Sequence, residues 1–297
     1  MDPAGSEPAS SGGTGPSGTS PHDAEARPLI DLTSRPSTVT YLREAWRRRE
    51  FAIVVPAQDL RAQNMDTTLG QLWHLVNPAL LVGVYFLVFG VIIPETRRGI
   101  DNFLGFLIIG VVLFHLTQRV TLEAAGSITQ NLGLIRSIQF PRILLPAASV
   151  NGQTAAFVPA LVLALLAVLA TGELPTLRWL VLPAVLVGQF AFNFGVALLV
   201  ARIGTTMRDL RQILPHLFRL LFYGSGVIFS VDAFVQSTAW RRAFALNPIY
   251  DVITCARWCL LGEPVDLWAV AGLVVWCIVM PALGFVVFHR SEQRLGA

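Results

Sequence analysis

Lysine is absent from this sequence, and all 22 of its basic residues are arginines. A phosphate-binding loop of the form G-x-x-x-x-G-K-[ST] needs its lysine to reach the β- and γ-phosphates of a nucleotide. No loop of this kind can therefore exist in the chain. This absence excludes the commonest way in which a transport or motor protein binds and hydrolyses ATP on its own.

Charge of either sign is also scarce. Only 14% of the 297 residues are charged and 54% are hydrophobic, whereas soluble domains carry about 25% charged residues. The net charge of +3 does not indicate nucleic-acid binding, because the arginines lie along the edges of apolar stretches and are not gathered on one face. The composition predicts a protein embedded in membrane lipid, with arginines at the headgroups.

Cysteine is rare, with Cys255, Cys259 and Cys277 as the three instances. Three cysteines in apolar surroundings are too few for a disulfide framework or a four-ligand zinc site. Cys255 and Cys259 are four residues apart, which on a helix leaves their Cβ atoms about 6 Å apart, and a disulfide needs about 4 Å. We therefore expect small buried side chains and no metal site.

Catalytic patterns are missing as well. Four histidines are scattered near the ends of separate apolar stretches, no carboxylate pair lies within one stretch, and no G-x-S-x-G motif occurs. The histidines concerned are His74, His115, His216 and His289. The chain is therefore not expected to be an enzyme and has no predicted catalytic residue.

The chain is expected to divide into three parts. Residues 1–36 are rich in Ser, Gly, Pro and Thr, which predicts a disordered tail. No signal peptide opens the sequence, so we expect this tail to stay in the cytoplasm. Residues 37–64 carry apolar groups at helical spacing opposite a basic face, typical of a helix lying in the membrane interface. A solvated basic helix that touches only protein is the alternative. Residues 65–297 form the predicted transmembrane domain.

Long apolar stretches dominate that domain, each near the ~20 residues that cross a bilayer. They predict an all-α integral membrane fold with six transmembrane helices, at 73–93, 103–120, 143–170, 179–201, 212–230 and 266–288. Residues 231–265 are too apolar for a free loop and too interrupted for a crossing. They favour one or two short re-entrant helices, whose irregular backbone must lie against protein or a watery cavity.

The arginines also predict orientation, because cytoplasmic segments are enriched in them. Placing both termini on one side gathers sixteen of the 22 arginines there, and that side is expected to be the cytoplasm. The predicted location is the cytoplasmic (inner) membrane, with several crossings. The re-entrant segment then lies on the outer side, where two copies would form a gate.

Several motifs resemble the membrane subunit of ABC-2-type exporters, in the branch that exports polysaccharides such as O-antigens, teichoic acids and cell-wall galactans. The resemblance covers nearly all of residues 38–290 and depends on the order and spacing of three groups of residues. They are Leu69-Gly70-Gln71-Leu72-Trp73 with Asn77-Pro78, then Ile138-Gln139-Phe140-Pro141-Arg142, then Asn247-Pro248-Ile249-Tyr250 followed by Arg257 and Leu260-Leu261-Gly262.

The resemblance implies a half-transporter that pairs with itself and with two copies of a cytoplasmic ATPase, which would bind the ATP and Mg²⁺. This chain would then contain no cofactor of its own. A short coupling helix, here Leu122 through Ile138, would dock on the ATPase, although an ordinary interfacial loop is the alternative. The predicted coupling residues are Glu123, Gln130, Asn131, Leu132, Ile135 and Arg136, and the predicted outer-gate residues are Asn247, Pro248, Tyr250 and Arg257.

The cargo implied by the resemblance is a polysaccharide on an undecaprenyl- or decaprenyl-type lipid. Aromatic faces suit sugar rings because they cover the C–H side and leave the hydroxyls to water. The predicted conduit residues are Tyr85, Phe86 and Phe89 on the first span and Phe218, Phe222, Tyr223 and Phe229 on the fifth. Helix packing or contact with lipid would explain such aromatics equally well.

Arg219 is the most distinctive single candidate in the predicted conduit. A charge inside a membrane span is costly and marks a functional site by default, and a guanidinium pairs well with phosphate. Snorkelling of Arg219 to the headgroups is the alternative. Two other functions stay open at this point, export of a small amphipathic drug or lipid, and a membrane enzyme acting on lipid-linked sugars.

Overall fold

The fold is described from a computed structural model, which places residues 38–50, 52, 72–137 and 140–295. Every regular element in these residues is a helix. The predicted disordered tail, residues 1–36, lies outside the described residues, and so does most of the predicted interface segment. Of that segment, helix α1 (Thr38–Arg47) is described, with Tyr41 buried and Trp46 exposed.

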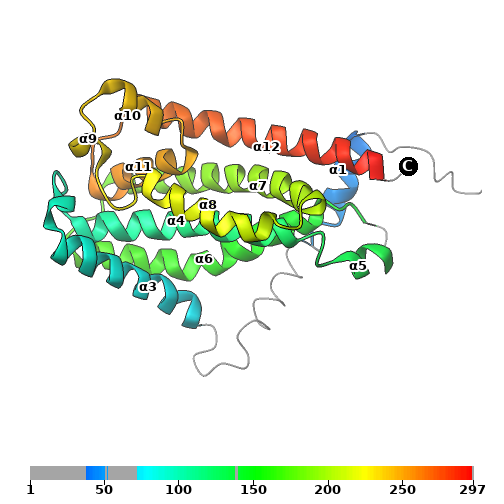
Figure 1. The fold of residues 1–297 in the computed structure, drawn as a ribbon, viewed down its shortest axis with the longest axis horizontal. Helices are drawn as coiled ribbons and strands as arrows, with labels where there is room; N and C mark the ends of the chain where they lie inside the picture. Colours follow the sequence, from blue (N-terminus) through cyan, green and yellow to red (C-terminus); the bar gives the residue numbers. More distant parts are fainter. Residues whose placement is uncertain (1–37, 51, 53–71, 138–139, 296–297) are drawn as a thin grey trace, which may run out of the picture. The chain divides into compact units, whose positions relative to one another are not determined.

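The long helices lie side by side in Figure 1, with α4 among them. α4 (Phe103–Gly126) packs against α3, α6, α7, α8 and α11 and is almost entirely buried. The other elements are α3 (Trp73–Tyr85), continued by a π-helix (Phe86–Ile92), a 3₁₀ turn (Pro94–Arg97), α5 (Leu132–Ser137), α6 (Leu144–Ala170), a 3₁₀ turn (Leu177–Val181), α7 (Leu182–Thr206), α8 (Leu210–Gly224), α9 (Val231–Phe234), α10 (Thr238–Phe244), α11 (Pro248–Leu261) and α12 (Leu267–Leu295).

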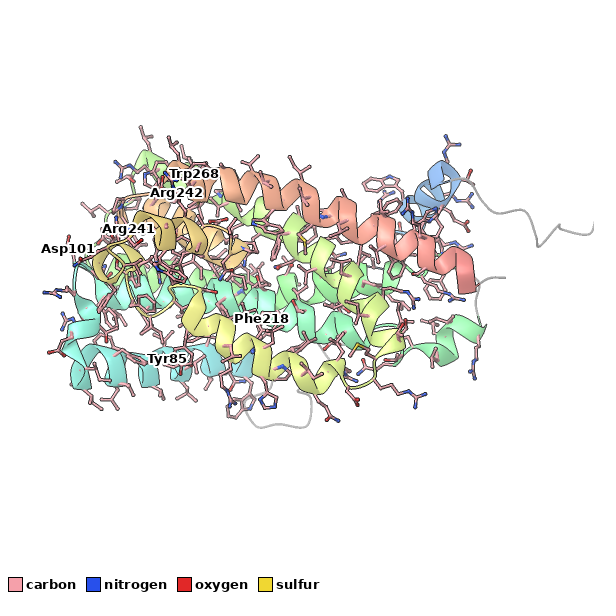
Figure 2. The ribbon with its side chains drawn as sticks, turned by 45° about the horizontal axis from the view of Figure 1, so that its top comes forward. Tyr85, Asp101, Phe218, Arg241, Arg242 and Trp268 are labelled. Carbon is pink, nitrogen blue, oxygen red and sulfur yellow. The ribbon has the colours of Figure 1, made fainter. Side chains whose placement is uncertain are left out.

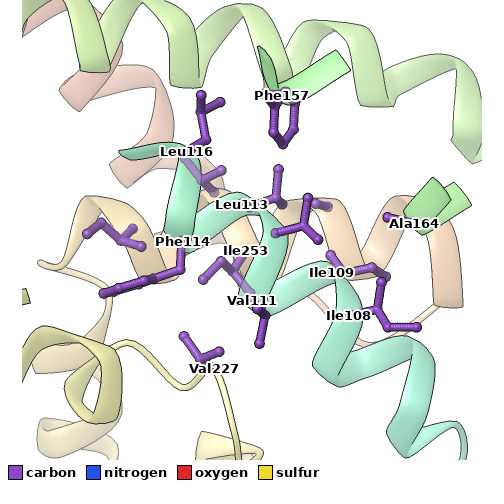
Figure 3. Close-up of a cluster of buried hydrophobic side chains, with 14 of the residues drawn as sticks. Ile108, Ile109, Val111, Leu113, Phe114, Leu116, Phe157, Ala164, Val227 and Ile253 are labelled. Atoms are coloured by element: carbon purple, nitrogen blue, oxygen red, sulfur yellow. The ribbon is translucent and has the colours of Figure 1, made fainter. Parts of the chain in front are cut away.

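The main core forms around α4, which has buried apolar side chains on all its faces. Figure 3 shows Val111 and Phe114 on the side that meets Val227 and Ile253, and Leu116 near Phe157 of α6. Because lipid tails are as apolar as these side chains, close packing rather than exclusion of water favours their association. Because α4 is apolar all round, it is expected to be central.

Glycines let α7 and α12 approach each other closely. A Cβ atom at Gly195 would overlap the main chain of Met280, and one at Gly284 would overlap the main chain of Gly195. A similar contact at the far end of α7 places Gly204 against the carbonyl of Ala125. Small residues at such crossings are typical of helix pairs in membranes.

Asn102 fixes the start of α4 and ties it to the end of α6. Its Oδ1 accepts a hydrogen bond from the Gly105 amide at 2.9 Å, which caps the helix. Its Nδ2 donates to Thr171 Oγ1 at 2.7 Å and to Glu173 Oε1 at 3.2 Å. These bonds hold the two helix ends at one level.

Hydropathy predicted most of the helices. Within the described residues, four helices are long and apolar enough to cross a membrane, and a shorter apolar stretch spans Val76–Ile92. The long ones are α4, α6, residues 177–206 and α12. They agree with the spans predicted at 103–120, 143–170, 179–201 and 266–288.

The span predicted at 212–230 differs from the structure. α8 has 15 residues and ends at Gly224, which gives about 22 Å at 1.5 Å per residue. The chain then turns through Gly226, whose φ is +59°, a value that glycine adopts without strain. Within 231–265, where one or two short re-entrant helices were predicted, the structure has three short helices, α9, α10 and α11.

Candidate functional site

α8 has one face that packs on the rest of the chain. Leu214, Phe218 and Phe222 follow one another at four-residue spacing and are each 4% exposed. The ring of Phe114 on α4 meets Phe218 edge-on at 5.8 Å and Phe222 at 5.0 Å. These aromatic contacts fix the rotation of α8 about its own axis, and therefore which residues it leaves uncovered.

The uncovered side of α8 carries a polar stripe, defined here as Gln212, His216, Arg219 and Tyr223. These residues recur at spacings of four, three and four, so they share one face of the helix. All four are exposed. No described residue forms a hydrogen bond or ion pair with Arg219, which lies nine residues after the start of α8. The chain thus presents a row of polar groups beside apolar helices.

Tyr85 on α3 lies at the edge of this stripe. Its ring stacks on Phe222 with 4.9 Å between centroids, and the ring of Tyr223 meets the same Phe222 edge-on at 5.8 Å. Figure 2 shows Tyr85 and Phe218 on neighbouring elements, α3 and α8. The two predicted conduit helices are therefore in contact at Tyr85 and Phe222.

The other predicted conduit aromatics lie elsewhere. Phe86 packs towards Phe103 at 6.3 Å, and Phe89 is half-buried beside Tyr85 at 6.2 Å. Phe229 lies beyond the end of α8, where it meets Phe234 and Phe244 edge-on. These side chains hold elements of the chain together, as the helix-packing alternative supposes.

Phe218 and Phe222 were predicted to line the conduit. In the single chain both side chains are buried against α4, and their role in a conduit stays a prediction. Sequence reasoning chose them as aromatics and overlooked Gln212 and His216. The missed signal was helical periodicity, since 212, 216, 219 and 223 are in phase with each other and out of phase with the aromatics.

Arg257 anchors the segment that follows α8. Its side chain is 4% exposed, and its Nη1 donates to the Gly226 carbonyl at 2.8 Å. Its Nη2 donates to the carbonyls of Val227 at 2.8 Å and Phe106 at 2.9 Å, and its Nε donates to Phe106 at 3.2 Å. The guanidinium also lies over the Phe106 ring at 3.2 Å. One residue of α11 thus joins α4 to the turn after α8.

Gly110 and Glu263 lie beside the Arg257 guanidinium and affect it in different ways. Gly110 leaves room for the guanidinium, because a Cβ atom there would lie 2.6 Å from Nη2. Glu263, in the loop after α11, does not hydrogen-bond to Arg257. Burial raises the pKa of the Glu263 carboxyl, and the charge of Arg257 opposes that rise. The predicted gate residue Arg257 is therefore held by main-chain oxygens.

Asn247 makes a second tie between α11 and α8. Its Oδ1 accepts from the Ile249 amide at 3.0 Å and caps α11, while its Nδ2 donates to Ser225 Oγ at 2.8 Å and to the Gly224 carbonyl at 3.2 Å. Pro248 occupies the first helical position of α11, where no amide is needed.

Tyr250 covers the turn between α8 and α9. A Cβ atom at Gly226 would lie 3.2 Å from its ring, and the ring lies 5.8 Å from that of Phe244 on α10. The four predicted gate residues thus lie in one cluster, with Arg257 inside it and the other three half-buried. Figure 2 labels Arg241, Arg242 and Trp268 near the same end of the molecule, where Arg242 lies over the Trp268 ring at 5.5 Å.

The predicted coupling segment is not one helix. α4 continues to Gly126, a turn follows, and α5 covers Leu132–Ser137, so Glu123 belongs to α4. Ser127 Oγ donates to the Ala124 carbonyl at 2.8 Å, which closes the end of α4. The prediction of a single helix from Leu122 to Ile138 is therefore wrong. Ile138 itself lies outside the described residues.

The exposed side of this segment is polar with one apolar residue. Leu132 is 46% exposed, and Gln130 and Arg136 are also exposed. Ile135 is half-buried in a cluster with Tyr41 of α1. The apolar groups that the sequence assigned to docking are thus divided between the surface and the interior.

Gln130 links this segment to the start of α8. With its amide oxygen facing α8, Gln130 accepts hydrogen bonds from both terminal nitrogens of Arg211 at 2.8 Å. The same guanidinium lies against Gly126, where a Cβ atom would be 3.0 Å away. The α4–α5 turn is therefore joined to the start of α8 through Arg211.

A family comparison identifies what kind of chain has this arrangement. The model of the ABC-2 type transporter family matches residues 55–261, which is more than half of the sequence. The chain belongs to the ABC-2 type transporter family. The matched part of this ABC-2 chain contains α8, the polar stripe and the whole α9–α11 segment.

Curated relatives of this ABC-2 chain cover most of its length. The O-antigen export system permease protein RfbA of Myxococcus xanthus is 29% identical over 216 residues, covering 73% of this chain and 82% of that protein. A protein of the same name from Klebsiella pneumoniae is 23% identical, with 82% and 93% covered. The polysialic acid transport protein KpsM of Escherichia coli is 23% identical, with 80% and 92% covered.

Proposed function

We propose that this ABC-2 chain is the membrane subunit of an ATP-driven exporter that moves a lipid-linked polysaccharide across the cytoplasmic membrane. Relatives named for O-antigen export and polysialic acid transport support this substrate class. The exposed polar stripe on α8 is the observation that carries the proposal.

The polar stripe must face water in the assembled transporter. A polar group that faces hydrocarbon without a partner costs several kcal/mol, and the stripe contains four such groups in a row. Two chains related by a twofold axis would place two stripes across a shared passage. In that passage Tyr223 and Tyr85 offer ring faces to sugars, and Arg219 offers two donors to a phosphate of the lipid carrier.

The proposal gives the chain six membrane crossings, which the four long apolar helices and the shorter apolar stretch Val76–Ile92 support. α3 with its π-helix, α4, α6, α7 and α12 each cross once, and α8 makes a sixth, shorter crossing that the α9–α11 segment completes at the outer end. Both termini lie in the cytoplasm, because the inner ends of these helices carry most of the arginines. The α9–α11 segments of two chains form the outer gate.

The energy source is a separate ATPase, present in two copies that bind the ATP and Mg²⁺. It docks below the α4–α5 turn, where Leu132 and Arg136 are exposed. The hydrogen bonds between Gln130 and Arg211 carry the movement of that turn to α8, and so to the stripe.

Export measured in intact cells tests this function. Arg219→Gln and Tyr223→Ala change the stripe and leave the buried face of α8 intact, so both proteins should accumulate normally. We expect surface polysaccharide to fall by about tenfold in Arg219→Gln, because a charge-assisted hydrogen bond to phosphate contributes about 1.5–3 kcal/mol. Polymer on its lipid carrier should collect inside the cell.

Leu220→Ala is the matched control, since Leu220 is exposed on a different side of α8. Its export should equal that of the unmodified chain. Normal export by both stripe variants would refute the role of the stripe, and transport by the chain in vesicles without an ATPase would refute the energy source.

A further inference from the structure

An apolar groove runs along the chain between α3, α4 and α6, away from the polar stripe. Its volume is about 250 Å³. The residues that line it are Pro78, Ala79, Val82, Ile108, Val112, Ala160, Leu163, Ala164 and Ala167. No polar side chain is among them, so the groove favours hydrocarbon over water.

Small side chains explain why the groove is open. Ala79 on α3 faces Ala160 and Ala164 on α6, and none of them is long enough to fill the space between the two helices. Protein interiors otherwise leave few voids larger than a water molecule. An engineered apolar cavity of ~150 Å³ already binds benzene, so this groove has room for a stretch of hydrocarbon chain.

One end of the groove is polar. A smaller hollow shares Pro78, Val112 and Ala160 with the groove and is also lined by His115, Arg119 and Gln153. These three polar side chains come from α4 and α6 and lie nearer the C-terminal end of α4 than the apolar part does. The groove and the hollow together are thus apolar along most of their length and basic at one end.

Arg119 carries a positive charge that no described residue pairs with. Within residues 38–50, 52, 72–137 and 140–295, no side chain or carbonyl forms a hydrogen bond or ion pair with its guanidinium. The neighbouring His115 directs Nδ1 to the Val111 carbonyl at 2.9 Å, which leaves its other ring nitrogen available. A half-buried guanidinium in apolar surroundings calls for an anion.

The groove and the hollow together match one leaflet of a bilayer in length. Ile108 and Arg119 are eleven residues apart on α4, or about 16 Å at 1.5 Å per residue. Half of the ~30 Å hydrocarbon core is about 15 Å. Arg119 itself lies seven residues before Gly126, about 10 Å from the end of the helix. The basic end is therefore at the depth of lipid phosphates that a long arginine reaches.

We propose that this groove binds one anionic phospholipid of the leaflet at the C-terminal end of α4, which is the cytoplasmic leaflet in the orientation proposed above. One acyl chain lies between α3 and α6, and the phosphate accepts hydrogen bonds from Arg119. The groove and the hollow together are about one leaflet long, which fits a fatty-acyl chain with its phosphate, whereas a long isoprenoid carrier would extend past them. The site is separate from the passage, because Tyr85 faces α8 and the groove lies on the α6 side of α3.

Native mass spectrometry of the purified full-length chain, stripped of lipid and titrated with phosphatidylglycerol, tests the site. Arg119→Gln removes the cation, and Ala160→Leu with Ala164→Leu fills the groove. Each change should weaken binding by at least about tenfold. Arg119→Lys, which keeps the charge, should retain most of the affinity.

Two matched controls change the same residue types elsewhere. Arg97→Gln removes an exposed arginine from the turn that precedes α4, far from Arg119, and Ala155→Leu enlarges an exposed alanine of α6. Both variants should bind phosphatidylglycerol like the unmodified chain. Arg119→Gln does not alter packing in the groove, so its result holds even if the leucine variant fails to fold.

Three results would overturn the proposal. The first is unchanged phosphatidylglycerol binding in Arg119→Gln. The second is competition by glycerol 3-phosphate alone, which would mean that no acyl chain is bound. The third is tighter binding of a long-chain prenyl phosphate than of phosphatidylglycerol. Because the assay measures lipid binding and not export, its failure leaves the proposed function untouched.

Discussion

The buried guanidinium of Arg257 offers a direct test of how the segment after α8 is held in place. Arg257→Met keeps most of the side-chain volume and removes every donor. The carbonyls of Gly226 and Val227 then each lose a hydrogen bond from a charged group, at about 1–3 kcal/mol each. Relief from burying a charge offsets part of this loss. We expect a net loss of about 2–4 kcal/mol in the free energy of unfolding.

Thermal unfolding of the detergent-purified protein, followed by tryptophan fluorescence, measures this loss. For a chain of this size the loss corresponds to a fall in Tm of about 4–8 °C. Arg242→Met is the matched control, because Arg242 is exposed and its contact is the Trp268 ring. Its change should stay within about 0.5 kcal/mol. Equal Tm values for Arg257→Met and the control would refute the anchoring role.

Two further predictions concern helix packing and use the same unfolding measurement. Phe222→Ala should cost about 3–5 kcal/mol, because a buried aromatic leaves a cavity, while Leu220→Ala on the exposed side of α8 should cost little; equal losses would contradict the assigned rotation of α8. Gly195→Val should lower stability by about 1–3 kcal/mol or more, since a side chain there overlaps the main chain of α12. Gly83→Ala, where a Cβ atom meets nothing within 4 Å, should be harmless, and a Gly195→Val protein as stable as Gly83→Ala would refute the close contact.

The apolar runs were enough to predict most of the helices, because hydrocarbon allows a chain few other structures. The exception was 212–230, where a count of apolar residues ignored which face each residue occupies. α8 is amphipathic, and the Gly224–Gly226 turn ends it before the apolar run ends. Residue spacing along α8 contained the missing information.

The candidate site was harder to predict, because its geometry depends on distant partners. Arg257 donates to a carbonyl 151 residues away and to two others about 30 residues away. A sequence motif shows that Arg257 stands near Asn247, but not that it is buried. Likewise, Phe222 and Tyr223 are adjacent in the chain, and only the position of α4 decides which of them is covered.

The partners of Arg257 have a consequence for how this part of the chain responds to acid. An arginine paired with a carboxylate loses its counter-charge when acid protonates the carboxylate, but the amide oxygens of Phe106, Gly226 and Val227 do not titrate in that range. The fastening of α11 to α4 should consequently persist in acidic media. Acid that would release an arginine from a carboxylate therefore leaves this joint closed.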